Sequence, residues 1–192
     1  MWRSSLAAAA LLLSGCAATA PAAPTPPGLH YAGRFSVSWR EPAADEAPQR
    51  ASGRFALRVA DQRSDLEVSS PLGQTLAVAT VTPESASLST ADGRSIRAER
   101  AEALTERAFG WPAPLSHLPR WLAAPAAGPR PASFEDSGWL VAVETWQDGL
   151  PRRLTLRWPA TPAAAPGREV ELRLLVDEVV AAPPVVAPVT PR

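Results

Sequence analysis

The sequence predicts a mainly β protein in which one strongly bent antiparallel sheet, or an open barrel, surrounds an apolar interior. Three observations support this prediction. About nine short segments alternate apolar and polar residues, which is the period of a strand with one wet face. Turn-forming pairs such as Asp92-Gly93 join several of these segments. Residues 99–123 break the two-residue period and predict two short helices that cover the interior as a lid or plug.

The first residues have the pattern of a lipoprotein signal peptide. A positive start at Arg3 is followed by the apolar run Leu6 to Leu13, by the small residues Ser14-Gly15, and by the only cysteine, Cys16. The apolar run is too short to span a bilayer as a permanent helix. We therefore expect residues 1–15 to be removed and Cys16 to be acylated. The alternative is a free cysteine near the start of a buried, Ala-rich helix.

The mature chain is expected to hold one domain between two segments without a core. Residues 17–27 are mostly Ala, Pro and Thr, so residues 16–29 are expected to form a flexible tether to the membrane. In enteric-type bacteria, alanine rather than aspartate after the acylated cysteine favours the outer membrane over the inner one. The domain is expected over residues 30–180, and the Pro-rich residues 181–192 are expected to be disordered.

Composition excludes several functions. All 19 basic residues are arginine and 19 residues are acidic, so loss of the signal peptide leaves a formal charge of −1. This balance does not suggest a nucleic-acid-binding polycation. With Cys16 acylated, no thiol remains for a disulfide or for nucleophilic chemistry.

The alternating segments fall on both sides of the helical stretch. Those before it are residues 31–40, 53–59, the segment around Leu66 and Val68, and residues 74–81, 86–90 and 95–98. Those after it are residues 139–146, 153–158 and 170–176, with a turn at Gln147-Asp148-Gly149. Residues 124–133 are expected to be a Pro- and Ala-rich loop. An interior built by such strands either fills with side chains or holds a ligand.

One turn places an apolar residue at its tip. Ser70-Pro71-Leu72-Gly73 has serine first, proline second and glycine fourth, the preference of a type I turn. Leu72 is then exposed near the end of a hairpin. A single exposed leucine is ordinary in a folded protein, and the alternative on a membrane-tethered domain is that Leu72 probes the bilayer.

The two predicted helices differ in their signals. Residues 99–109 suit a short amphipathic helix that ends at Gly110 and Pro112. Residues 115–123 suit a second helix, in which Pro119 must lie in the first turn or begin the helix afresh.

Signals for catalysis and for cofactors are missing. His30 and His117 have no ligand-spaced partner, so a packing or surface role is expected and no metal site. The carboxylate pairs Glu135-Asp136 and Asp177-Glu178 fall at element ends, where solvation and turn formation explain them. No GxxxxGK phosphate loop is present. The tryptophans fit either a packed core or the lining of an apolar pocket.

Two longer stretches connect the chain to a known family. They are residues 64–76, SDLEVSSPLGQTL, and residues 110–122, GWPAPLSHLPRWL. Together with SGRF at residues 52–55, Gly138-Trp139 and Leu172 to Asp177, their order and spacing resemble the LolB family. The chain departs from the usual pattern at Ala123-Ala124 and after Asp177, which affects the lid and the end of the barrel.

The resemblance implies an unclosed, strongly curved β-barrel whose short helices form a lid over a cavity for acyl chains. It implies a non-enzymatic, cofactor-free, monomeric outer-membrane lipoprotein that accepts acylated lipoproteins from a LolA-like periplasmic carrier and inserts them into the inner leaflet of the outer membrane, contacting phospholipid. It further implies that Leu72, in the projecting loop Pro71-Leu72-Gly73, touches the bilayer. The alternative is a structural or assembly lipoprotein that binds a protein on the same sheet.

The residues expected at this site follow from alternation and from the predicted lid. Alternation assigns to the cavity wall Phe35, Trp39, Phe55, Leu57, Leu66, Val68, Leu76, Val78, Trp139, Val141, Leu154, Leu156, Leu172 and Leu174. The lid residues are Leu115, Leu118, Trp121 and Leu122. Basic strand residues Arg54, Arg58, Arg152 and Arg153 are either solvated or a surface for an acidic carrier.

Overall fold

A computed structural model describes residues 28–40, 47–123, 130–161 and 168–182. The strands are β1 (Gly28–Arg40), β2 (Gln49–Ala60), β3 (Arg63–Ser69), β4 (Thr75–Val81), β5 (Ala86–Thr90), β6 (Ser95–Ala98), β7 (Ser133–Asp136), β8 (Trp139–Gln147), β9 (Leu150–Trp158) and β10 (Glu169–Ala182). The helices are α1 (Ala101–Phe109) and α2 (Leu118–Leu122). The expected signal peptide, Cys16 and the tether up to residue 27 lie outside the described residues, as does the expected tail beyond Ala182.

All ten strands form one antiparallel sheet. Their order is β6-β5-β4-β3-β2-β1-β10-β9-β8-β7, so the chain builds one half outward from β1 and returns through β10 to build the other. Strands β6 and β7 lie at the two ends of this order and do not pair with each other, so the sheet is not closed. The mainly β fold, the antiparallel pairing, the unclosed sheet and the two short helices are confirmed.

The sheet has one strand more than the sequence suggested. Strand β7 follows the Pro- and Ala-rich loop, and Phe134 is the one large apolar residue in it. A four-residue strand with a single apolar side chain gives too short an alternation to stand out from a loop. At the other end of the chain, β10 continues to Ala182, past the expected start of the tail.

The two faces of the sheet differ in polarity because successive side chains point to opposite sides. Phe35 and Val37 of β1 lie opposite Leu174 and Leu172 of β10 on one face, which we call the covered face. The opposite face, which we call the outer face, carries Arg34 and other polar residues that alternate along β1 with Phe35 and Val37. The covered face carries most of the buried core, with Leu154, Leu156 and Val141 fully shielded from solvent.

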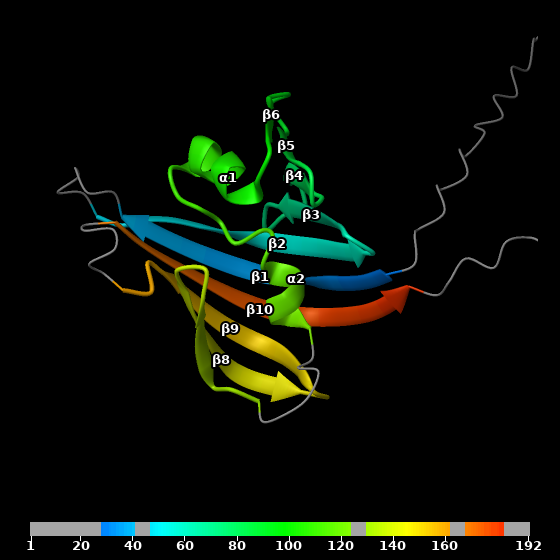
Figure 1. Cartoon of the computed structure of the whole chain (residues 1–192), viewed down its shortest axis with the longest axis vertical. Helices are drawn as coiled ribbons and strands as arrows, with labels where there is room; N and C mark the ends of the chain where they lie inside the picture. Colours follow the sequence, from blue (N-terminus) through cyan, green and yellow to red (C-terminus); the bar gives the residue numbers. More distant parts are fainter. Residues whose placement is uncertain (1–27, 41–46, 124–129, 162–167, 183–192) are drawn as a thin grey trace, which may run out of the picture.

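Both helices lie over the covered face (Figure 1). Trp111, just after α1, packs edge-on against Trp139 of β8, with ring centroids 6.2 Å apart. Trp121 of α2 packs edge-on against Phe134 of β7 at 6.4 Å. Helix α1 also contacts β5 and β6, and α2 contacts β9, so the insert covers both halves of the sheet. Within the described ranges, neither helix has the length and apolar character of a membrane span.

Candidate functional site

The hairpin between β3 and β4 presents Leu72 to solvent. The Gly73 amide donates to the Ser70 carbonyl at 2.9 Å, which closes the predicted four-residue turn, and the Ser70 amide donates to the Gln74 carbonyl at 2.8 Å. Gly73 has φ of +86°, a conformation that favours glycine. The Leu72 side chain is 91% exposed. The turn is thus held by its backbone, and Leu72 contributes nothing to the core.

Strand β4 corrects part of the predicted cavity wall. Leu76 and Val78 are 44% and 39% exposed and lie on the outer face, so their assignment to the interior is wrong. Their neighbours Ala77 and Ala79 face the interior because they pair with Val68 and Leu66 of β3. Every residue from Leu76 to Ala79 is apolar, so alternation within β4 carries no information about its orientation. The pairing with β3 sets the register instead.

The other predicted wall residues share the covered face. The registers of β1, β2, β3, β8, β9 and β10 place them there: Phe35, Trp39, Phe55, Leu57, Leu66, Val68, Trp139, Val141, Leu154, Leu156, Leu172 and Leu174. Phe35, Trp39 and Val68 are half-buried, and the rest are buried. The face is therefore a continuous apolar surface.

The predicted lid residues are all buried against this surface. Leu115, Leu118, Trp121 and Leu122 have exposed fractions between 1% and 9%. Pro119 lies in the first turn of helix α2, as the sequence requires. Helix α1 ends at Gly110, which has φ of +79° and whose amide donates to the Glu106 carbonyl. Helix α2 has only five residues and makes few backbone hydrogen bonds to the sheet that it covers.

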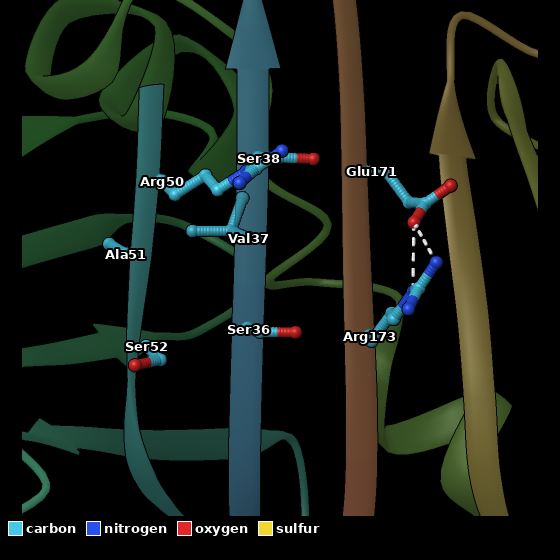
Figure 2. Close-up of a pocket in the computed structure, with 8 residues that line it drawn as sticks. All are labelled: Ser36, Val37, Ser38, Arg50, Ala51, Ser52, Glu171 and Arg173. Atoms are coloured by element: carbon cyan, nitrogen blue, oxygen red, sulfur yellow. Dashed lines mark hydrogen bonds and ion pairs between the residues drawn. The ribbon is translucent and has the colours of Figure 1, made fainter. Parts of the chain in front are cut away.

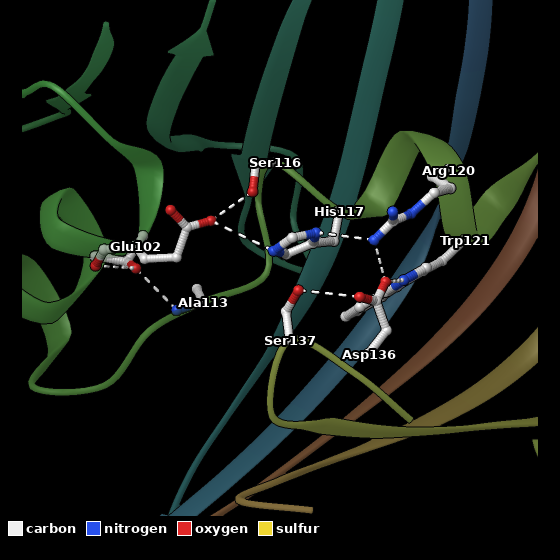
Figure 3. Close-up of polar contacts among 9 residues, drawn as sticks. Glu102, Ala113, Ser116, His117, Arg120, Trp121, Asp136 and Ser137 are labelled. Atoms are coloured by element: carbon white, nitrogen blue, oxygen red, sulfur yellow. Dashed lines mark hydrogen bonds and ion pairs between the residues drawn. The ribbon is translucent and has the colours of Figure 1, made fainter. Parts of the chain in front are cut away.

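A chain of polar contacts, the latch, joins this cover to α1 and to the β7–β8 turn (Figure 3). Glu102 of α1 accepts a hydrogen bond from the Ser116 hydroxyl, and its carboxylate lies 3.6 Å from His117 Nε2. Asp136 of β7 accepts a 2.6 Å hydrogen bond from Trp121 Nε1 and pairs with Arg120. The latch spans the insert from one side to the other, so opening the cover requires breaking it.

The contacts of the latch shift the pKa of one of its residues, Asp136. Burial raises the pKa of Asp136, but the hydrogen bonds from Trp121 and Ser137 and the charge of Arg120 outweigh it and hold the pKa below its ordinary value near 3.8. A carboxyl whose pKa is lowered by folding stabilises the fold above its unfolded-state pKa. That contribution is lost as the pH falls through the lowered, folded-state pKa.

We expect Asp136→Asn to lower the free energy of unfolding by about 1 kcal/mol at neutral pH, because the amide still accepts from Trp121 but no longer attracts Arg120. The loss of stability on acidification below about pH 4 should become shallower. Urea unfolding across a pH series measures both effects. The matched control is Asp61→Asn at the β2–β3 turn, which should leave the curve unchanged; equal effects of the two changes would contradict the latch.

An apolar pocket of about 340 Å³ opens beside the cover. Trp121 of α2, Phe134 of β7, and Val143 and Trp146 of β8 line it, together with the polar residues Arg120, Glu135 and Asp136. The pocket lies next to the latch and at the edge of the sheet formed by β7.

Several residues of this site were not predicted from the sequence. Tyr31 is buried on the covered face but was not among the predicted wall residues. His117 and Asp136, expected to pack or to be solvated, are joined through Arg120 in the latch. No local signal marks these contacts, because the partners come from segments that meet only in the folded chain. Among the described residues, no cluster of three or more side chains suited to a metal ion occurs.

Comparison with known proteins gives one consistent result. The family model described as "Outer membrane lipoprotein LolB" matches residues 30–178. The chain is 34% identical over 181 residues to the outer-membrane lipoprotein LolB of Bordetella petrii, covering 87% of each chain. It is also 34% identical over 200 residues to LolB of Ralstonia nicotianae, covering 90% of this chain and 94% of the relative. A third relative, LolB of Azoarcus sp., is 34% identical over 180 residues, covering 88% and 90%.

These matches extend over nearly the whole described sheet, including the projecting hairpin, the insert and β10. The family model alone spans well over half of the chain. They agree with an open sheet whose apolar face lies under a short helical cover. The chain therefore belongs to the LolB family, the non-enzymatic outer-membrane lipoproteins that accept lipoproteins from the LolA carrier and insert them into the outer membrane.

Proposed function

We propose that the acyl chains of the cargo enter between the cover and the covered face, and that Leu72 then enters the bilayer to deliver them into the inner leaflet of the outer membrane. The observation that carries the membrane step is the 91% exposure of Leu72 on a turn closed by backbone hydrogen bonds. Residues 1–15 are the proposed signal peptide, acylated Cys16 the anchor, and the protein acts as a monomer.

The apolar interior supplies the energy of cargo acceptance. Burial of an acyl chain stabilises by about 0.8 kcal/mol per methylene, so a chain of roughly fourteen carbons gains about 10 kcal/mol gross. The sequence has no phosphate loop for nucleotide hydrolysis. Each transfer step then lowers the free energy of the cargo, first from the carrier to a receptor that binds it more tightly and then to the bilayer. In this proposal the sheet curves around the acyl chain. The cavity is the space that opens when the cover moves away from the covered face.

The cover is the element that moves in this proposal. Leu115, Leu118 and Leu122 bury the same face that the acyl chain needs, so cargo and cover compete for it. The latch residues Glu102 and Asp136 hold the cover closed through side-chain contacts. Displacing the cover exposes apolar side chains, and the incoming acyl chain compensates for that cost.

Fatty-acid binding tests the interior directly. The full chain carrying Cys16→Ser, which prevents acylation, should bind a fluorescent fatty acid and release it to unlabelled palmitate. Phe134→Glu places a carboxylate in the pocket beside the cover and should weaken binding at least about tenfold, whereas Leu76→Glu on the outer face should not. Circular dichroism verifies that both variants fold. A folded parent protein that binds no fatty acid would refute the proposed cavity.

A further inference from the structure

A groove of about 510 Å³ crosses the outer face of the sheet, on the side away from the cover. Figure 2 shows its residues on three adjacent strands, β2, β1 and β10. They are Ser36, Val37, Ser38, Arg50, Ala51, Ser52, Glu171 and Arg173. The groove is separate from the apolar interior, because Ser36, Ser38 and Ser52 belong to the opposite set of alternating residues.

The strand register explains why this part of the sheet is hollow. Ser36 lies between Ser52 on β2 and Arg173 on β10, and Ser38 lies between Arg50 and Glu171. Serine side chains on the middle strand are short, whereas the arginines on either side are long. The serines therefore form the floor and the arginines the walls. Arg50 extends from β2 toward Ser38 in Figure 2.

The chemistry of the groove suits a phosphate group. The carboxylate of Glu171 already accepts from Arg157 Nε at 3.1 Å and from Arg173 Nε at 2.8 Å. The groove lining itself has two arginines and one carboxylate, so its charge is positive. Ser36 and Ser52 are exposed and add hydroxyl donors beside Arg50. Guanidinium and hydroxyl donors around a small hollow match the oxygens of a phosphate monoanion.

The groove lies at the same end of the sheet as Leu72. Arg54 of β2 lies opposite Ser69, the last residue before the projecting turn. Ser52 and Arg50 continue β2 from Arg54 in the direction in which that turn projects. Strand β2 neighbours β3, and β1 and β10 are one and two strands further, so the groove extends from about 5 to about 15 Å to the side of the hairpin. Along the strand direction the groove is level with the projecting turn, so contact of Leu72 with a membrane brings the groove to the membrane surface.

We propose that this groove binds the headgroup phosphate of an anionic phospholipid while Leu72 is inserted in the bilayer. The inference rests on the proposed membrane contact of Leu72, because that contact brings the groove to the membrane. The lipid would fix the orientation of the sheet during delivery, with the β1–β2–β10 outer face turned toward the headgroups. Leu72 and the groove would then form two separate points of attachment.

Vesicle partitioning of residues 16–192 carrying Cys16→Ser, which lack the apolar segment Leu6 to Leu13 that would itself bind vesicles, tests this proposal. Binding is measured on vesicles of phosphatidylcholine alone and on vesicles with phosphatidylglycerol, and the ratio of the two partition coefficients reports anionic recognition. Arg50→Gln should lower this ratio about fivefold, the effect of one arginine near an anionic surface. The matched control is Arg58→Gln, on the same face of the same strand but about 27 Å away at the other end, and it should leave the ratio nearly unchanged.

The outcomes separate the groove from the membrane contact. Leu72→Gln, which removes the apolar side chain without adding charge, should lower binding to both kinds of vesicle and preserve the ratio; normal binding by that variant would refute the Leu72 contact itself. Equal ratios for Arg50→Gln and Arg58→Gln would mean diffuse electrostatic attraction and would overturn the groove. Inorganic phosphate, added at constant ionic strength, should compete only weakly. If phosphate abolished the ratio, the groove would be a site for the free anion and not for the lipid.

Discussion

Leu72→Glu is expected to reduce delivery of an acylated lipoprotein to liposomes at least about tenfold while leaving its acceptance from the carrier intact. Burying a leucine in an apolar phase gains about 1.5–3 kcal/mol, and a carboxylate loses this gain and adds a desolvation cost. The turn should survive the change, because backbone bonds between Ser70, Gly73 and Gln74 hold it. Acceptance is measured by co-purification of cargo with the receptor, and delivery by flotation of cargo with liposomes.

The control for this experiment is Val180→Glu. Val180 is 42% exposed on β10, at the end of the sheet opposite the projecting hairpin. The Val180→Glu substitution adds the same charge at an exposed apolar position, so the variant should deliver cargo normally. Normal delivery by Leu72→Glu, or an equal defect in both variants, would contradict the role of the hairpin.

Leu156→Ala should lower the free energy of unfolding by about 2–5 kcal/mol, the range for removing a buried leucine without collapse of the space. Leu156 is fully buried on β9, between Val141 of β8 and Leu172 of β10. It lies in the middle of the half of the sheet under α2. Urea denaturation followed by tryptophan fluorescence measures the change, since Trp139 belongs to the same buried face.

The matched control for this measurement is Leu76→Ala. Leu76 was expected on the same interior wall, but the structure places it on the outer face. Its truncation should change stability by no more than about 0.5 kcal/mol. A large loss at Leu76 together with a small loss at Leu156 would mean that the register is inverted.

Features that depend only on neighbouring residues in the sequence were predicted correctly. Asp92-Gly93 forms its turn, with the Gly93 amide donating to the Thr90 carbonyl at 2.9 Å, because the sequence of a short turn fixes its backbone. Strand orientation was predicted wherever polar and apolar residues alternate, as in β1 and β9. The outer orientation of Leu76 and Val78 could not be predicted, since it depends on pairing with Leu66 and Val68 and not on β4 itself.

The contacts of the cover show the same limit over longer distances. Asp136 accepts from Trp121, fifteen residues earlier in the chain, and Glu102 contacts Ser116 across a separation of fourteen. Such pairs depend on how the insert docks on the sheet, and no spacing rule brings them together. The apolar residues of the cover were predictable because burial follows from the helical pattern. The polar contacts that hold the cover were not.

The central claim, that cargo acyl chains lie against the covered face, is tested most directly by photo-crosslinking. A lipoprotein whose acyl chain carries a photoreactive group near its end is transferred from the carrier to the receptor and illuminated. Crosslinks are expected on residues of the covered face, such as Val141, Leu156 and Leu172, and on the cover at Leu118. Crosslinks confined to exposed outer-face residues such as Arg54 or Arg173, with none beneath the cover, would contradict the account.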